Sequence, residues 1–167
     1  VHHFAGRPED AIREALKARE IVPGFEEAGN VLIASYEALG RYEEAAAIIA
    51  QQPYWAVPLD GQALAAAYRE GGPGAYWRKQ LALMPEWATV PPIVHFSLAI
   101  IECYLGEPDA ALHHVESMVD NHLGACVFLA VDPALAPLRG HPRYQAALNR
   151  IGVGPQQTAS AGHTAST

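Results

Sequence analysis

Glycine-marked breaks recur at nearly constant spacing along this chain. Gly6, Gly40, Gly72 and Gly106 each end a helix-favouring segment, and the intervals between them are 34, 32 and 34 residues. Two segments of helical length lie between successive glycines. A period of this size is typical of stacked helix–turn–helix units, in which glycine eases a tight turn that residues with a Cβ atom resist. We therefore predict an all-α chain built as an array of helical hairpins.

Side chains recur at fixed distances from these glycines. Eight residues before the last three stand Leu32, Leu64 and Leu98, four residues before them stand Tyr36, Tyr68 and Glu102, and five residues after all four stand Ala11, Ala45, Trp77 and Ala111. The small residues let antiparallel helices approach closely, while the leucine and tyrosine side chains fill the space between hairpins. Glu102 and Trp77 depart from the pattern, so we expect atypical packing in the third and fourth units.

The period and these side chains resemble the tetratricopeptide repeat. The resemblance implies a right-handed α–α superhelical solenoid with a C-terminal capping helix. The expected divisions are a partial first repeat at 1–23, units at 24–58, 59–90 and 91–123, a cap at 124–153 and a disordered tail at 154–167. The expected helices are Pro8 to about Ile21, Glu26 to Leu39, Tyr42 to Gln51, Asp60 to Glu70, Ala75 to Met84, Pro92 to Leu105 and Pro108 to Asn121.

The first unit is represented only by its second helix. Such a helix at the edge of an array would expose its apolar stripe of Ala11, Ile12, Ala15 and Leu16 to water, whereas terminal repeats normally have a polar outer face. The chain also begins with Val1 and not with methionine. We therefore expect the sequence to be a piece of a longer protein.

The repeat period stops after the fourth hairpin. Asp132 and Pro133 are typical of a helix start, and Pro142 opens a last helix through Ile151. Its apolar stripe consists of Tyr144, Ala147, Leu148 and Ile151. A helix with one apolar face at the end of an array would cover the last hairpin.

This ending resembles the C-terminus of a group of bacterial multidomain regulators, in which tetratricopeptide units finish in a D-P-x-L/F-x-P-L-R-x-x-P-R-F/Y segment. The matching residues are Asp132, Pro133, Leu135, Pro137, Leu138, Arg139, Pro142, Arg143 and Tyr144, and segments 76–81 and 105–112 are also similar. In that group the repeats follow a winged-helix DNA reader, a serine/threonine kinase or a nucleotide cyclase. None of those effector motifs occurs in this sequence, so the resemblance implies the arrangement and not the activity.

Charge and composition narrow the function classes. The net charge of −7 would repel a phosphate backbone or an anionic membrane surface, and no run rich in lysine or arginine offsets it. Cys103 and Cys126 lie in apolar surroundings, which favours buried thiols over a disulfide framework or a zinc site. We expect a cytoplasmic location, with the periplasm as the alternative if upstream sequence spans a membrane.

Neither catalysis nor metal binding finds support in the motifs. His113 and His114 are adjacent and would point about 100° apart on a helix, so we interpret them as ordinary surface histidines. The glycine-rich stretch 70–74 lacks the lysine and hydroxyl residue of a phosphate-binding loop and falls in register as a turn. We therefore expect no catalytic residues, no cofactor and no metal.

The remaining candidate site is the concave wall formed by the first helix of each unit. By register its residues are Glu27, Asn30, Ala34 and Glu37, then Gln62, Ala66, Arg69 and Glu70, then Ile93, Phe96, Ile100 and Cys103. One end of this wall is polar and acidic and the other is apolar. A peptide with a basic end and an apolar anchor would fit it. Alternatively, the apolar residues of the fourth unit contact the C-terminal cap.

The sequence thus predicts a non-catalytic protein–protein interaction module, the regulatory arm of a larger bacterial signalling or transcription-regulating protein. The alternative is a domain that senses a small molecule in the groove and controls an attached effector. A carboxylate clamp of the kind that binds chaperone tails needs several basic and amide side chains along the groove. Only Asn30 and Arg69 are available, so that ligand is not expected.

Overall fold

The computed structural model describes residues 3, 6–54, 57–84 and 94–154, and this part of the chain is all-helical. The α-helices are α1 (Pro8–Ile21), α2 (Glu26–Ala38), α3 (Tyr42–Ile49), α4 (Gly61–Leu83), α5 (Val94–Leu105), α6 (Pro108–Asp120) and α7 (Pro142–Arg150). Two 3-10 helices, η2 (Gly124–Phe128) and η3 (Pro133–Leu138), lie between α6 and α7. The predicted helix bounds agree to within about two residues wherever the chain is described, and Pro92 lies outside the described residues.

The long helix α4 consists of two helices joined at a sharp break. Gly71 and Gly72 leave the helical conformation, and Gly72 adopts a positive φ of 67°. Asp60 caps the first segment by accepting a hydrogen bond from the Ala63 backbone N–H at 3.0 Å. The break separates the two helices that the sequence predicts here, so α4 is the third helical hairpin.

All four recurring glycines occupy the left-handed region of backbone conformation. Gly6, Gly40, Gly72 and Gly106 have φ values of 68°, 71°, 67° and 78°. At the end of α2, the Arg41 N–H donates to the Tyr36 carbonyl at 2.8 Å and the Gly40 N–H to the Glu37 carbonyl at 3.0 Å. This pair of bonds is the Schellman helix ending. The predicted role of the glycines as turn residues is confirmed.

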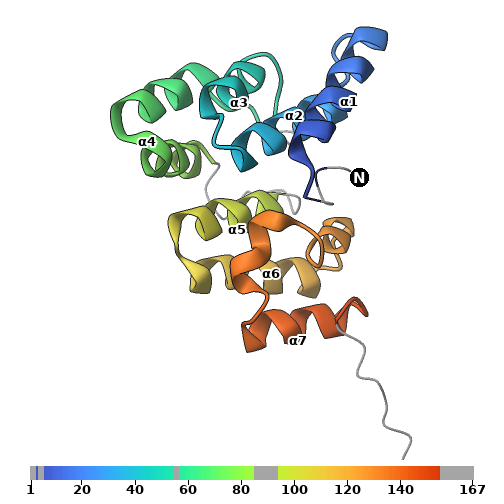
Figure 1. Ribbon diagram of the computed structural model, residues 1–167. Helices are drawn as coiled ribbons and strands as arrows, with labels where there is room; N and C mark the ends of the chain where they lie inside the picture. The colour runs from blue at the N-terminus through green and yellow to red at the C-terminus, as the bar shows by residue number, and fades with distance from the viewer. Residues whose placement is uncertain (1–2, 4–5, 55–56, 85–93, 155–167) are drawn as a thin grey trace, which may run out of the picture.

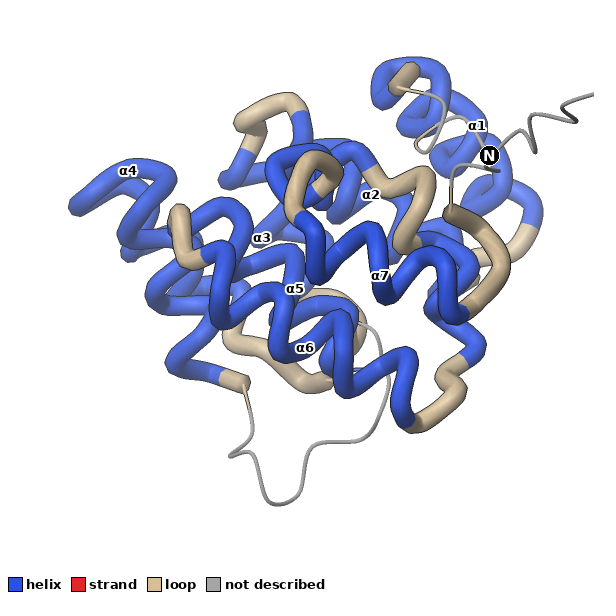
Figure 2. The backbone as a smooth tube through the Cα atoms, turned by 90° about the horizontal axis from the view of Figure 1, so that it is seen from below, coloured by secondary structure: helices blue, strands red, loops and turns tan. Residues whose placement is uncertain are grey.

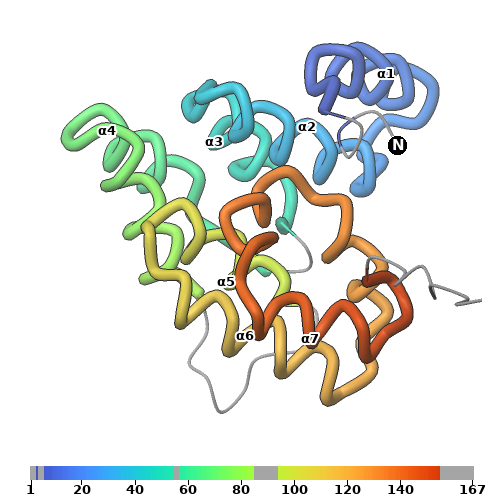
Figure 3. The backbone as a smooth tube through the Cα atoms, turned by 60° about the horizontal axis from the view of Figure 1, so that its bottom comes forward, coloured from blue at the N-terminus to red at the C-terminus, as the bar shows by residue number. Residues whose placement is uncertain are grey.

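Each helix packs against the next along the chain, from α1 to α6, and α6 then packs against α7. In Figure 1, α1 to α4 lie across the upper part of the molecule and α5 to α7 across the lower part. The same succession can be followed from below in Figure 2. In Figure 3, the segment that precedes α7 reaches back toward α2.

Two hydrophobic clusters form the core, and α5 contributes to both. The first cluster joins α1 to α4 and includes Leu32, Leu64 and Trp77, together with Val94, Leu98 and Ile101 of α5. The second joins α6, η2, η3 and α7, together with Phe96 and Ala99 of α5. One face of α5 therefore packs into the first cluster and the opposite face packs into the second, so this helix joins the two halves of the molecule.

The expected exposure of the α1 stripe is wrong for most of its residues. Ala11, Ile12 and Ala15 are buried, and only Leu16 is largely exposed, at 45%. The reason is that α1 packs closely on α2, where the small side chain of Ala28 joins Ile12 and Ala15 in the first cluster. A single neighbouring helix is enough to cover this stripe.

The two residues that depart from the repeat pattern are both buried. Trp77 stacks on Tyr104 of α5, with the ring centroids 4.2 Å apart and the ring planes within 4°. The Glu102 carboxylate lies 3.3 Å from Nε2 of His114 on α6. Atypical packing is thus present at both positions, because a large ring or a buried acid replaces the expected alanine or tyrosine.

The C-terminal segment caps the second cluster. Asp132 accepts a hydrogen bond from the Ala134 N–H at 2.8 Å, which confirms its predicted capping role at η3. Tyr144, Ala147 and Leu148 of α7 are buried, as predicted for this stripe, and the Arg143 guanidinium binds the Glu116 carboxylate of α6 at 2.8 Å. Among the described helices, none is long and apolar enough to cross a membrane.

Candidate functional site

Five of the predicted groove residues meet around one cavity, here called the α2–α5 hollow. Glu27, Asn30 and Ala34 line it from α2, and Phe96 and Ile100 line it from α5. Its volume is about 200 Å³. The segment before α7 closes a further side through Phe128 and Asp132. Residues almost seventy positions apart are therefore gathered because α5 lies opposite α2.

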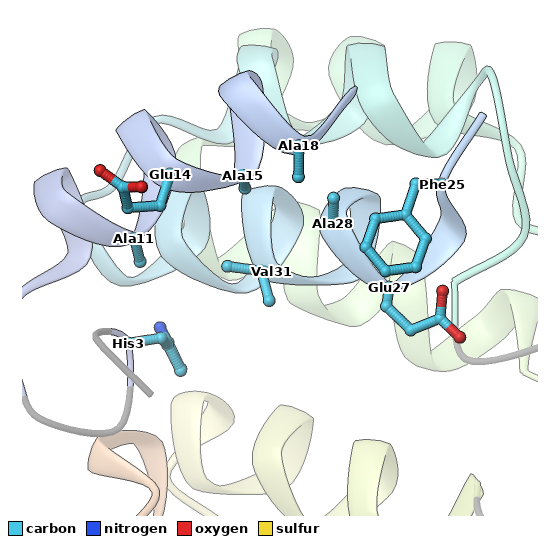
Figure 4. A pocket seen from close by; sticks show the side chains of 9 residues that line it. All are labelled: His3, Ala11, Glu14, Ala15, Ala18, Phe25, Glu27, Ala28 and Val31. Carbon is cyan, nitrogen blue, oxygen red and sulfur yellow. The ribbon is translucent and has the colours of Figure 1, made fainter. Parts of the chain in front are cut away.

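A second hollow of about 240 Å³ lies between α1 and α2, here called the α1–α2 hollow (Figure 4). Its floor consists mainly of small apolar residues, Ala11, Ala15, Ala18, Ala28 and Val31. Glu14 and Glu27 lie at opposite ends of it in Figure 4, and Phe25 stands beside Glu27. The two hollows share His3, Glu27 and Val31, so they adjoin each other along α2, and together they are here called the groove.

The groove is acidic. Glu14, Glu27 and Asp132 contribute carboxyl groups, and none of the described residues lining either hollow is lysine or arginine. Asp132 is only 3% exposed, and burial raises the pKa of its carboxyl group, while the Ala134 N–H and the neighbouring His3 lower it. Burial in turn lowers the pKa of His3, so the imidazole is mostly neutral at neutral pH.

His3 connects the start of the described chain to this groove. Its Nδ1 atom lies 3.5 Å from the Ser35 hydroxyl of α2, and the ring also lies close enough to Asp132 for the two to influence each other's pKa. The side chain is buried and borders both hollows. The repeat pattern places no groove residue before α1, so the position of His3 in the groove could not be predicted from the sequence.

Glu37 does not belong to an acidic exposed wall, and this part of the expected groove is wrong. The side chain is buried, and burial raises the pKa of its carboxyl group to about 8. The Tyr76 hydroxyl donates to it at 2.8 Å and the Tyr54 hydroxyl at 3.4 Å. Gln80 lies near and also opposes the rise in pKa, although its own amide has no hydrogen-bond partner within the described chain.

The predicted residues of the third unit lie elsewhere. Gln62 and Arg69 line a separate depression of about 250 Å³ between α3 and α4, where Arg69 is 3.7 Å from Glu43. Glu70 is exposed at the end of the same helical segment, and Ile93 lies outside the described residues. Helix α4 packs against α3 and α5. The wall of the α2–α5 hollow that faces α2 is therefore provided by α5 and not by α4.

The C-terminal segment covers much of the fourth unit, as the alternative interpretation states. Phe96 packs against Phe128 with the ring centroids 5.9 Å apart, and η3 lies against α5. Cys103 is half-buried beside Leu138 and Pro137, away from the two hollows. Phe96 and Ile100 still border the α2–α5 hollow, so the cap narrows this end of the groove without filling it.

A row of polar side chains crosses the α5–α6 interface. The Nδ1 atoms of His95 and His114 are 2.9 Å apart, Glu102 lies beyond His114, and the Ser117 hydroxyl is 3.5 Å from Nε2 of His95. His114 is completely buried, so its interpretation as a surface histidine is wrong. Among the described residues, no group of three or more metal-binding side chains has a geometry suited to a metal ion.

Comparison with known proteins adds no relative. No protein-family model, no curated protein and no solved structure gives a significant match to this chain.

Proposed function

We propose that this chain is a protein-interaction module of the tetratricopeptide type that binds an extended peptide along α2. The proposal is supported by the order of helical hairpins, with turns at glycines spaced 34, 32 and 34 residues apart. It is supported further by the groove that five residues of the predicted concave wall border. Its expected setting, the regulatory arm of a larger bacterial signalling protein, rests on the resemblance of the segment from Asp132 to Tyr144.

The observation that carries the proposal is the division of the groove into two small connected hollows. Each measures about 200 to 240 Å³, below the roughly 300–1,000 Å³ that is usual for sites holding one drug-sized ligand. Hollows of this size suit single side chains. Two of them joined along one helix suit two side chains of one extended chain.

Charge and polarity indicate which peptide fits. The alanine floor of the α1–α2 hollow offers apolar contact, and Glu14 and Glu27 border it. The α2–α5 hollow adds Asp132. A peptide with an apolar residue near a basic residue would satisfy both features, since opposite charges steer association and apolar burial contributes affinity.

The test is selection of peptides from a random library, followed by measurement of affinity against variants that fill the hollows. Ala34→Phe would fill the α2–α5 hollow and Ala18→Phe the α1–α2 hollow. Ala65→Phe is the matched control, because Ala65 lines the depression between α3 and α4. We expect the first two variants to weaken binding at least about tenfold and the control to change it little. Equal affinity for all three variants and the parent would overturn the proposal.

A second candidate is sensing of a small molecule. The observation in its favour is that the α2–α5 hollow is the more enclosed of the two and has mixed apolar and polar walls. A thermal-shift screen with metabolites would test it, and the same Ala34→Phe variant should abolish any stabilisation. If a metabolite still stabilises the Ala34→Phe variant, its binding site lies outside the α2–α5 hollow.

A further inference from the structure

The walls of the α2–α5 hollow combine two kinds of chemistry. Aromatic rings of Tyr54, Phe96 and Phe128 border it, and so do the carboxyl groups of Glu27 and Asp132. The rings come from three separate parts of the chain: the α3–α4 connection, α5 and η2. The hollow is therefore lined by aromatic side chains and by acids together.

Aromatic faces and carboxylates both favour a positive charge. A cation near a ring face is attracted by the ring quadrupole, and the attraction grows when water is excluded. A carboxylate that is largely removed from water is stabilised strongly by a counter-charge. Asp132, at 3% exposed, is such a group when it is ionised, and the hydrogen bond that it accepts from the Ala134 N–H leaves its carboxyl oxygens with capacity for further donors.

Arg139 lies near Asp132, and its charge lowers the pKa of the Asp132 carboxyl group. Its guanidinium donates to the backbone carbonyl of Asp132 at 3.3 Å, and Arg139 is exposed and does not line the hollow. His3 borders the hollow, but burial keeps its pKa low. Among the described residues that line the hollow, Glu27 and Asp132 are acids and none is lysine or arginine.

We propose that the α2–α5 hollow binds an organic cation of the alkylammonium type. The ammonium group lies between the carboxyl groups of Glu27 and Asp132 and the aromatic rings, and the aliphatic stem lies along Ala34 and Ile100. The identity of the ligand rests on the proposed function. In a bound peptide, the ligand is a lysine side chain. A free alkylamine carries the same chemistry, and the experiment distinguishes the two sources.

The first measurement uses n-butylammonium chloride as the probe and n-butanol as its uncharged counterpart of similar shape. Methyl-labelled protein reports binding through the Ala34, Val31 and Ile100 signals, all of which border the hollow. We expect saturable shifts with butylammonium at millimolar concentration and at least about tenfold weaker binding of butanol. Equal binding of the two probes, or no shift with butylammonium, would overturn the proposal.

The second measurement repeats the titration with variants. Glu27→Gln removes an exposed acid without threatening the fold, and Asp132→Asn keeps an oxygen that can cap η3. We expect each to weaken butylammonium binding several-fold. Glu43→Gln is the control, since it changes the net charge equally but lies at the α3–α4 depression. Binding weakened equally by all three would indicate a general charge effect and would contradict a local site.

The third measurement follows pH. The titratable or charged groups that act on Asp132 include His3, Arg139, Cys103, Tyr104 and Tyr144, and Glu27 and the buried Glu37 lie on the adjoining helix. Acidification adds positive charge to His3 and removes negative charge from Asp132, whose pKa burial raises. Butylammonium binding should therefore weaken on acidification. Binding that strengthens or stays constant would count against the site.

The source of the cation is decided with peptides. Library-selected peptides are compared with versions in which each lysine is replaced by norleucine, which keeps the stem and removes the charge. Weaker binding after replacement supports a peptide lysine. If peptides bind in the groove but tolerate norleucine, a peptide lysine is not the ligand of the cation site, while the interaction module stands. If butylammonium binds and no peptide does, the cation site stands and the interaction module falls.

Discussion

At the residue scale, the buried carboxyl group of Glu37 is expected to make the stability of the protein depend on pH. Its ordinary pKa of 4.5 rises to about 8 in the folded protein because burial disfavours the charged form. Between these two values the folded state keeps a proton that the unfolded chain releases, so stability falls as the pH rises from about 4.5 to about 8. The Tyr76 and Tyr54 hydroxyls reduce this cost without removing it.

Replacement of Glu37 by glutamine should remove that part of the pH dependence. Relative to the parent, Glu37→Gln is expected to gain about 3–5 kcal/mol of unfolding free energy between about pH 5 and pH 9. Urea unfolding at both pH values measures the difference. Glu43→Gln, an exposed change of the same kind, should show no such trend. Parallel pH profiles of parent and Glu37→Gln would show that the carboxyl group titrates normally.

Trp77 provides a second test at the residue scale. The ring is 2% exposed and stacks on Tyr104, and its indole N–H has no hydrogen-bond partner within the described chain. Trp77→Ala should cost about 3–5 kcal/mol because it leaves a cavity. Trp77→Phe keeps a ring and removes the unsatisfied N–H, so it should cost at least about 2 kcal/mol less. Chemical denaturation gives both values, and equal losses would refute the importance of the stack.

At the scale of elements, helix bounds and turn positions were largely predictable from the sequence, because proline, glycine and capping residues act locally. Gly106 shows this: its position after a helical run predicts a left-handed turn, and its φ is 78°. The contacts that bury Glu37 were not predictable, since their donors come from residues 54 and 76. Likewise, His95 and His114 are nineteen positions apart, and only the α5–α6 packing brings them together.

The same glycine gives a prediction for the helical turn. Gly106→Ala introduces a Cβ atom that meets no neighbour within 4 Å, so any loss of stability reflects the left-handed backbone alone. We expect a loss of about 1–2 kcal/mol. Gly140 also has open space around it but is not in the left-handed region, and Gly140→Ala should be nearly neutral. Thermal unfolding of the two variants compares them directly, and equal effects would contradict the backbone explanation.

At the scale of the whole molecule, the two core clusters share α5. The repeat pattern predicts which residues of each helix are buried but not that α5 would lie opposite α2, because that depends on contacts between residues far apart in the sequence. This is also why the sequence placed the third-unit residues Gln62 and Arg69 in the groove, whereas the hollow is bordered by α2, α5 and Asp132.

Because α5 belongs to both clusters, we expect the two halves to unfold together. Leu135→Ala, at a completely buried position of the second cluster, should cost about 2–4 kcal/mol. Hydrogen exchange should then accelerate to a similar degree in α2 and in α7. Val127→Ala, on the same segment but 62% exposed, should change exchange little. Acceleration confined to α6 and α7 would show instead that the clusters unfold separately.

The contact between His95 and His114 also limits how hydrogen atoms can be distributed inside the hairpin of α5 and α6. With the two Nδ1 atoms 2.9 Å apart, one nitrogen must carry a hydrogen and the other must not. Glu102 stands at the far side of His114 and Ser117 beside His95. The hydrogen position on one imidazole ring is therefore tied to that on the other, inside a hairpin that also holds a buried acid and a partly exposed hydroxyl.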